Sequence, residues 1–190
     1  MSKEGTQDAV NLYLVGFMGV GKSAVGRSVA RYLGMRFLDS DRVIENSLGM
    51  PIREFFAREG EASFRARERA FVESGHPARG CVIACGGGLP IPPGMIELLR
   101  ERGVVVCLFA RTDTILARTA SSQKRPLLNV DDPASRVKDL LREREPIYMR
   151  AGPGICTENR SIQEVVSHVV RLYRREARDF TRRQQKETSA

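Results

Sequence analysis

Short runs of apolar residues alternate with longer amphipathic segments along most of the chain. Apolar runs of this length are typical of strands that are buried on both faces of a parallel sheet. The segments between them repeat apolar residues at the three- and four-residue spacing of helices. The pattern predicts strands at 10–15, 35–38, 80–84, 103–109 and 153–156, and helices at 22–33, 41–75, 94–101, 111–120, 134–148 and 161–177.

This alternation favours one α/β domain with a parallel sheet and helices on both faces. We expect a flexible N-terminus at 1–9, a single domain at 10–175 and a basic C-terminal tail at 176–190. Ligands of such sheets bind at the carboxyl ends of the strands. We therefore expect the ligand-binding and catalytic residues in the segments that follow the predicted strands.

Residues 16–23 match the phosphate-binding pattern G-x-x-x-x-G-K-[ST] and lie between the first predicted strand and helix. Glycines allow positive φ angles, which turn successive N–H groups inward around an anion, and the helix N-terminus adds further donors. We expect Lys22 to reach the β- and γ-phosphates and the Ser23 hydroxyl to bind Mg²⁺. The sequence therefore predicts a nucleoside triphosphate site made by Gly19, Val20, Gly21, Lys22, Ser23 and Ala24.

Asp39 and Asp41 follow the second predicted strand, two residues apart. In extended chain such residues point the same way, so one carboxylate suits Mg²⁺ and the other a substrate hydroxyl, whose proton it would accept. A helix N-cap followed by a first-turn acid is the alternative, since Asp is favoured at both positions. The third predicted strand ends without the Asp of a Walker B segment, which leaves Asp39 as the better candidate for the metal's second protein contact.

Gly86, Gly87 and Gly88 follow the third predicted strand. They form either a flexible turn or a place where the backbone approaches a ligand closely. Three consecutive glycines at the carboxyl end of a strand favour the second interpretation. Residues 121–132 interrupt the helical pattern, because Pro126 and Pro133 limit the continuation of a helix there. The segment carries Arg125, so it is either disordered or a lid that closes over the site.

Composition narrows the class of protein. A hydrophobic content of 42% in 190 residues fits a globular domain, and no apolar run approaches the ~20 residues that span a bilayer. The polar N-terminus lacks the apolar region of a signal peptide. We therefore expect a cytoplasmic protein with no membrane partner, in which the four cysteines are reduced packing residues.

The net charge of +8 raises the possibility of nucleic-acid binding. From residue 171 onward seven Lys or Arg and three Asp or Glu give 7 − 3 = +4, so half of the excess lies near the C-terminus. No interleaving of aromatic and basic residues accompanies it. We predict no nucleic-acid partner and a solvated, partly frayed helix there, and we interpret the charged segment at 60–69 as mostly a solvated helix face.

Six segments in this order resemble the shikimate kinases. They are the loop at 16–23, Phe-Leu-Asp-Ser-Asp at 37–41, Gly-Glu-Ala-Ser-Phe-Arg-Ala-Arg-Glu at 60–68, the three glycines, Arg-Pro-Leu-Leu at 125–128 and Arg-Glu-Pro-Ile-Tyr at 144–148. The resemblance implies a P-loop NTPase-type, five-stranded parallel sheet flanked by helices, similar to nucleoside monophosphate kinases, with a lid. It also implies transfer of the γ-phosphoryl group of ATP to the 3-hydroxyl of shikimate.

The resemblance further implies roles for single residues. Asp41, Lys22 and Arg125 would be catalytic, with Asp41 as the base and Arg125 closing from the lid. Ser23 and Asp39 would hold Mg²⁺, while Arg118 and Arg160 would contact the nucleotide. The substrate would be bound by Asp41, Arg65, Gly86, Gly87, Gly88 and Arg144, the arginines taking its carboxylate.

Two alternatives stay open at this point. A gluconate-type small-molecule kinase shares the loop and an acidic pair, and a non-catalytic nucleotide-binding regulatory protein would give the basic tail a purpose. We expect ATP and shikimate to be the partners and the protein to be a monomer.

Overall fold

The computed structural model describes residues 8–119 and 132–188. Five parallel strands form one sheet in the order β2-β3-β1-β4-β5. Their bounds are β1 (Asn11–Val15), β2 (Arg36–Asp39), β3 (Cys81–Ala84), β4 (Gly103–Phe109) and β5 (Gly154–Cys156). The predicted five-stranded parallel α/β fold is therefore confirmed.

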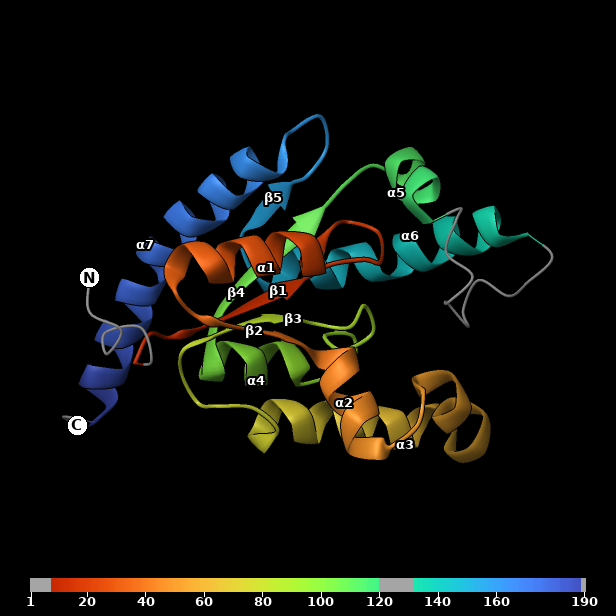
Figure 1. The fold of residues 1–190 in the computed structure, drawn as a ribbon, viewed down its shortest axis with the longest axis horizontal. Helices are drawn as coiled ribbons and strands as arrows, with labels where there is room; N and C mark the ends of the chain where they lie inside the picture. Colours follow the sequence, from red (N-terminus) through yellow and green to blue (C-terminus); the bar gives the residue numbers. More distant parts are fainter. Residues whose placement is uncertain (1–7, 120–131, 189–190) are drawn as a thin grey trace.

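Seven helices surround the sheet in the described part of the chain. They are α1 (Lys22–Leu33), α2 (Ser40–Leu48), α3 (Ile52–Ser74), α4 (Met95–Arg102), α5 (Thr112–Thr119), α6 (Pro133–Ala151) and α7 (Ile162–Thr188). Helices α1 and α7 pack together on one face, whereas α4 lies on the other face with α3 outside it (Figure 1). No helix among the described residues is long and apolar enough to cross a membrane.

The strands could be predicted from the sequence because their residues are buried in the core. All five residues of β1 are buried, and Leu12, Tyr13 and Leu14 are completely inaccessible because β1 is the central strand with helices on both faces. Cys81, Cys85 and Cys107 are buried free thiols, as expected, and Cys156 is half-buried.

The segment predicted as one helix at 41–75 is instead two helices. Gly49, at φ 66°, ends α2, and Pro51 precedes the first turn of α3. Within α3, Gly60 has φ 80° and ψ 173°, which divides the helix into two parts at a kink. Because such angles are open almost only to glycine, the bend is encoded at this residue.

The C-terminal helix is longer than the predicted helix at 161–177 and includes the segment that we expected to be a solvated, partly frayed helix. Helix α7 continues through this point to Thr188, and the side chain of Phe180 is buried in the core cluster. Arg79 from the loop before β3 also donates to Gln184 Oε1 at 3.5 Å. Residues 176–188 therefore belong to helix α7, packed at Phe180 and exposed at 181–186. The predicted lid at 121–132, except Asp132, and most of the flexible N-terminus lie outside the described residues.

We expect Phe180→Ala to lower the free energy of unfolding by about 3 kcal/mol, because it removes a buried aromatic ring. Urea denaturation measures the change, and Arg182→Ala is the matched control, since this exposed side chain lies half a turn further along the same helix. A loss below about 0.5 kcal/mol for Phe180→Ala would show that the helix end does not contribute to the fold.

Candidate active site

Three glycines shape the loop between β1 and α1. Gly16, Gly19 and Gly21 have φ angles of 133°, 79° and 97°, which other residues rarely adopt. Gly21 is the N-cap of α1, so the first unpaired N–H groups of the helix lie at this loop. Lys22 Nζ donates hydrogen bonds of 2.8 Å to the carbonyl oxygens of Gly16 and Phe17. The loop thus presents N–H groups and an ammonium group together, as an anion site requires.

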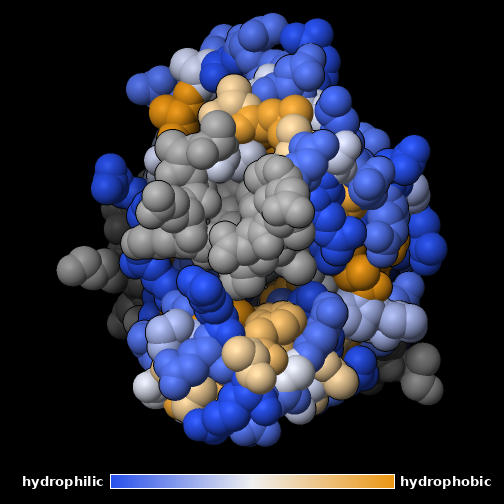
Figure 2. Space-filling view, turned by 90° about the vertical axis from the view of Figure 1, so that its right-hand side faces the viewer, coloured by the Kyte–Doolittle hydropathy of each residue, from blue (hydrophilic) through white to orange (hydrophobic). Residues whose placement is uncertain are grey.

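The remaining predicted phosphate contacts lie in the same place. The side chain of Val20 is buried, so only its backbone can meet a ligand, and Ala24 lies exposed in the first turn of α1. Figure 2 looks onto the end of the molecule that carries the carboxyl ends of the strands. Hydrophilic residues predominate on the visible protein surface there, with small separate hydrophobic areas.

Ser23 and Asp39 meet where α1 passes the end of β2. Ser23 Oγ donates to Asp39 Oδ2 over 2.8 Å, which places a hydroxyl oxygen beside a carboxylate oxygen. Mg²⁺ prefers oxygen ligands and commonly takes only one or two from the protein, the rest coming from phosphates and water. The pair fits such a site, and the described residues contain no cluster of three or more His, Cys, Asp or Glu that would offer a complete protein cage.

Ser40 connects the segments that follow β2 and β3. Its buried hydroxyl accepts a 2.8 Å hydrogen bond from the Gly86 N–H. Asp41, the next residue, lies so close to Gly86 that a Cβ atom there would overlap its carboxylate. Burial raises the pKa of Asp41, the charge of Asp39 raises it further, and Lys22 opposes both. The half-buried Asp41 carboxylate is therefore more basic than an ordinary aspartate.

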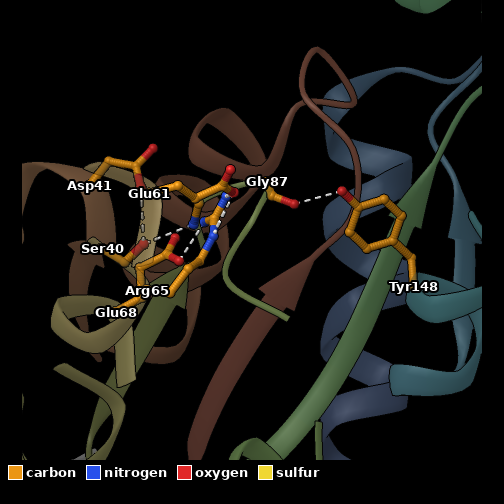
Figure 3. A network of polar contacts seen from close by, with 8 residues as sticks. Ser40, Asp41, Glu61, Arg65, Glu68, Gly87 and Tyr148 are labelled. Carbon is orange, nitrogen blue, oxygen red and sulfur yellow. Dashed lines mark hydrogen bonds and ion pairs between the residues drawn. The ribbon is translucent and has the colours of Figure 1, made fainter. Parts of the chain in front are cut away.

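Arg65 lies between two carboxylates on α3. Its guanidinium contacts Glu61 at 2.7 Å and Glu68 at 2.6 Å, and a Cβ atom at Gly88 would overlap it (Figure 3). Glu68 is 1% exposed, and burial raises its pKa to about 7 although Arg65 acts in the other direction. Most of the segment at 60–69 is exposed, as we expected, but Arg65 is half-buried and Glu68 is buried, because α3 turns this side toward the strand ends.

Arg144 reaches the site from α6. It is 8% exposed, and its Nε has no hydrogen-bond partner among the described residues. Tyr148, one turn later, donates from its hydroxyl to the Gly87 carbonyl at 2.6 Å (Figure 3). Both Arg144 and Arg65 act electrostatically on Tyr148. A buried guanidinium nitrogen without a partner is costly, so Arg144 is disposed to receive an acceptor.

Two further predicted arginines lie beyond the phosphate loop. Arg118 Nη1 donates to Thr157 Oγ1 at 3.2 Å and lies 3.5 Å from the Gly19 carbonyl, which brings α5 against the loop. Arg160 lies three residues after Thr157, and its Nη1 donates to the Cys156 carbonyl at 3.3 Å. Arg125 falls outside the described residues.

Sequence reasoning assigned no role to Ser40, Glu68 or Tyr148. Glu68 lies three residues after Arg65, and this spacing was the one available signal for their ion pair. The contacts of Ser40 with Gly86 and of Tyr148 with Gly87 join residues 46 and 61 positions apart. No local pattern could have revealed these two contacts.

A glycine loop of this geometry, at the carboxyl edge of a parallel sheet and opposite carboxylates and guanidinium groups, defines a P-loop kinase of small molecules. A sequence model described as shikimate kinase matches residues 18–174. The chain belongs to the shikimate kinase family, and it is a kinase.

Individual relatives agree. The shikimate kinase of Caldanaerobacter subterraneus subsp. tengcongensis is 42% identical over 163 residues, which cover 86% of this chain and 95% of that protein. A structure of the Acinetobacter baumannii shikimate kinase in complex with shikimate has a TM-score of 0.84 and 36% sequence identity, covering 90% of this chain and 96% of that one. A gluconokinase from Sinorhizobium meliloti has a TM-score of 0.55 at 19% identity and covers 97% of both chains, which shows the fold alone.

Stability should depend on pH through Glu68. Its pKa is raised from 4.5 to about 7, so between these pH values the folded protein holds a proton that the unfolded chain releases. The free energy of unfolding therefore falls as pH rises through this window, by up to about 3 kcal/mol. Asp41, whose pKa is also raised, adds a contribution of the same sign.

Glu68→Gln should flatten this dependence when urea denaturation is compared at pH 5 and pH 8. Glu73→Gln is the control, because Glu73 lies on the same helix and pairs with Arg69, but its side chain is 45% exposed. An unchanged slope in Glu68→Gln would contradict the raised pKa.

Proposed function

We propose that this protein transfers the γ-phosphoryl group of ATP to the 3-hydroxyl of shikimate, giving 3-phosphoshikimate and ADP. The observation that carries the choice of acceptor is the buried guanidinium of Arg144, whose Nε lacks a partner. A planar carboxylate satisfies a guanidinium with two parallel hydrogen bonds, which favours an acceptor that bears a carboxylate, a group that shikimate and gluconate share. The relative from Acinetobacter baumannii, solved with shikimate bound, supports this choice.

The acceptor carboxylate would be held by Arg144 and Arg65 together. Glu61 and Glu68 fix the Arg65 guanidinium, and the ring of Phe64 lies 5.8 Å below it. The side chain therefore loses little freedom when a ligand binds, which favours affinity. Gly86, Gly87 and Gly88 complete this side of the site by allowing close approach of the backbone.

Asp41 would orient the 3-hydroxyl and accept its proton while the hydroxyl oxygen bonds to the γ-phosphorus and the bond to the β-phosphate oxygen breaks. Burial and Asp39 raise the pKa of Asp41 toward the working pH, which suits a general base. The carboxylate lies directly against Gly86, next to the predicted acceptor contacts. Its position supports this role.

The nucleotide phosphates would lie in the glycine loop, where Lys22 and the N–H groups of Gly19, Gly21 and Ser23 face them. Arg118 approaches from α5 beside Gly19, and we propose phosphate contacts for it and for Arg125 of the lid. Arg160 would lie on the adenine side. These cations would stabilise the charge that spreads over the transferred phosphoryl oxygens.

We propose that Ser23 and Asp39 hold Mg²⁺, because their oxygens already lie 2.8 Å apart. When bound, the ion would neutralise charge on the β- and γ-phosphates. Asp39 would also orient Ser23 through the hydrogen bond that the two share. Ser40, between the two aspartates, keeps both at the strand end.

An assay of ADP release tests the function. Shikimate should stimulate release in the presence of ATP and Mg²⁺, gluconate should not, and EDTA should abolish the reaction. Lys22→Ala serves as a check that the activity belongs to this chain. Turnover with gluconate and none with shikimate would refute the proposal.

Asp41→Asn should lower kcat by about 10²- to 10⁴-fold, since the amide cannot accept the proton, while the KM for ATP changes less than about twofold. Steady-state kinetics with both substrates varied measures the two effects. Asp113→Asn, on an exposed position of α5, is the control. A kcat equal to that of the unmodified enzyme would remove Asp41 from the role of base.

A further inference from the structure

The three glycines after β3 have all their carbonyl oxygens occupied. The Gly86 carbonyl accepts from the Leu89 N–H at 3.1 Å, and the Gly88 carbonyl accepts from the Ile91 N–H at 3.1 Å. The Gly87 carbonyl accepts from the Tyr148 hydroxyl at 2.6 Å. On the donor side, Gly86 N–H is bound to Ser40, whereas the N–H groups of Gly87 and Gly88 have no partner among the described residues. Each carbonyl oxygen thus already has one partner, whereas the N–H groups of Gly87 and Gly88 are left for a ligand.

Tyr148 differs from the other two partners because it comes from another element. Leu89 and Ile91 close turns within the glycine segment itself, whereas Tyr148 reaches it from α6. Its ring is 3% exposed and lies edge-on to Phe17 of the phosphate loop, with the ring centroids 6.4 Å apart. Burial raises the pKa of Tyr148 to about 12, so the hydroxyl keeps the proton that it donates.

The geometry of the peptide unit connects this hydrogen bond to the site. The Gly87 carbonyl and the Gly88 N–H belong to one planar peptide, and no peptide bond in the described residues is cis. In a trans peptide these two groups point in opposite directions. Gly87 lies between Arg65 and Tyr148 in Figure 3, and its carbonyl points at Tyr148. The Gly88 N–H consequently points away from Tyr148, and the space where a Gly88 side chain would begin is filled by the Arg65 guanidinium.

We propose that Tyr148 is a positioning residue, which holds the Gly87 carbonyl so that the Gly88 N–H is aimed at the acceptor carboxylate beside Arg65. The identity of the ligand in this inference rests on the proposed function. The orientation of the Gly87–Gly88 peptide does not depend on that function. Consecutive glycines have the greatest backbone freedom of any sequence, so a fixed donor here needs a bond from outside the segment. Arg144 lies four residues before Tyr148 and so on the same face of α6, which lets one helix supply both a ligand-binding guanidinium and the group that orders the backbone donor.

Tyr148→Phe retains the ring against Phe17 and removes the hydroxyl, and with it both the bond to the Gly87 carbonyl and the hydrogen-bonding contact with Arg144, which the relaxation measurement below separates. The KM for shikimate should rise about tenfold, with kcat and the KM for ATP changed less than about twofold, since the lost donor contacts a part of the acceptor that does not react. Tyr173→Phe is the matched control. Its hydroxyl also donates to a backbone carbonyl, that of Val10, at 2.6 Å, and the ring is 6% exposed, but it lies on α7 away from the site.

An unchanged KM for shikimate in Tyr148→Phe would overturn the proposal, and so would an equal rise in Tyr173→Phe, which would indicate a general loss of stability. A fall in kcat with no change in KM would also contradict it. The predicted result is a higher KM for shikimate in Tyr148→Phe and not in Tyr173→Phe.

A second measurement does not depend on the substrate. Backbone ¹⁵N relaxation of the free protein should show the Gly88 amide order parameter falling from about 0.85 to below about 0.6 in Tyr148→Phe and unchanged in Tyr173→Phe. If the unmodified protein does not phosphorylate shikimate, the proposed function fails, while this result still decides whether Tyr148 orders the peptide. An equally ordered Gly88 in both variants overturns the positioning role.

Discussion

The arrangement of the acceptor side depends on one buried hydrogen bond, from the Gly86 N–H to the Ser40 hydroxyl. Strands β2 and β3 bring Asp39 opposite Ala84 in their parallel register, and this bond continues the pairing beyond the last strand residues. Because Ser40 stands between Asp39 and Asp41, fixing it to the glycine segment fixes both carboxylates. A site of this kind needs the sheet to be paired up to its edge, since the groups proposed to be catalytic are carried by the residues that follow.

The site also brings together carboxylates and guanidinium groups that are largely removed from water. Asp41 and Glu68 are carboxylates with raised pKa values, and Arg65 and Arg144 are guanidinium groups largely removed from solvent. Arg65 is satisfied by two acids, whereas the Nε of Arg144 is not satisfied by any described residue. The protein thus fixes one cation with its own anions and leaves capacity on the other. Such an arrangement would bind an anionic ligand without a large rearrangement of the protein.

Local patterns were sufficient to predict the strands, the order of the elements and the phosphate loop, because a buried strand and a glycine loop are each encoded within a few neighbouring residues. They were insufficient where the outcome depends on distant partners. The burial of Glu68 follows from how α3 packs, and the hydrogen bond of Tyr148 to Gly87 joins residues 61 positions apart. The extension of α7 to Thr188 was missed because a single buried residue, Phe180, lies among charged ones. Two helices were read as one at 41–75, since Gly49 and Pro51 interrupt the helix without interrupting its apolar spacing.

Lys22 carries a consequence for how nucleotide affinity should be understood. Its ammonium group is bonded to the carbonyl oxygens of Gly16 and Phe17 within its own loop. A phosphate in the loop would therefore meet an ammonium group that two backbone carbonyl oxygens already hold in place. The same bonds hold the long side chain in place beforehand, which spares most of the entropy that a mobile lysine would lose. The loop is therefore ordered around its own lysine before any phosphate enters it, and the backbone carbonyl oxygens that hold the side chain are part of what makes the site ready.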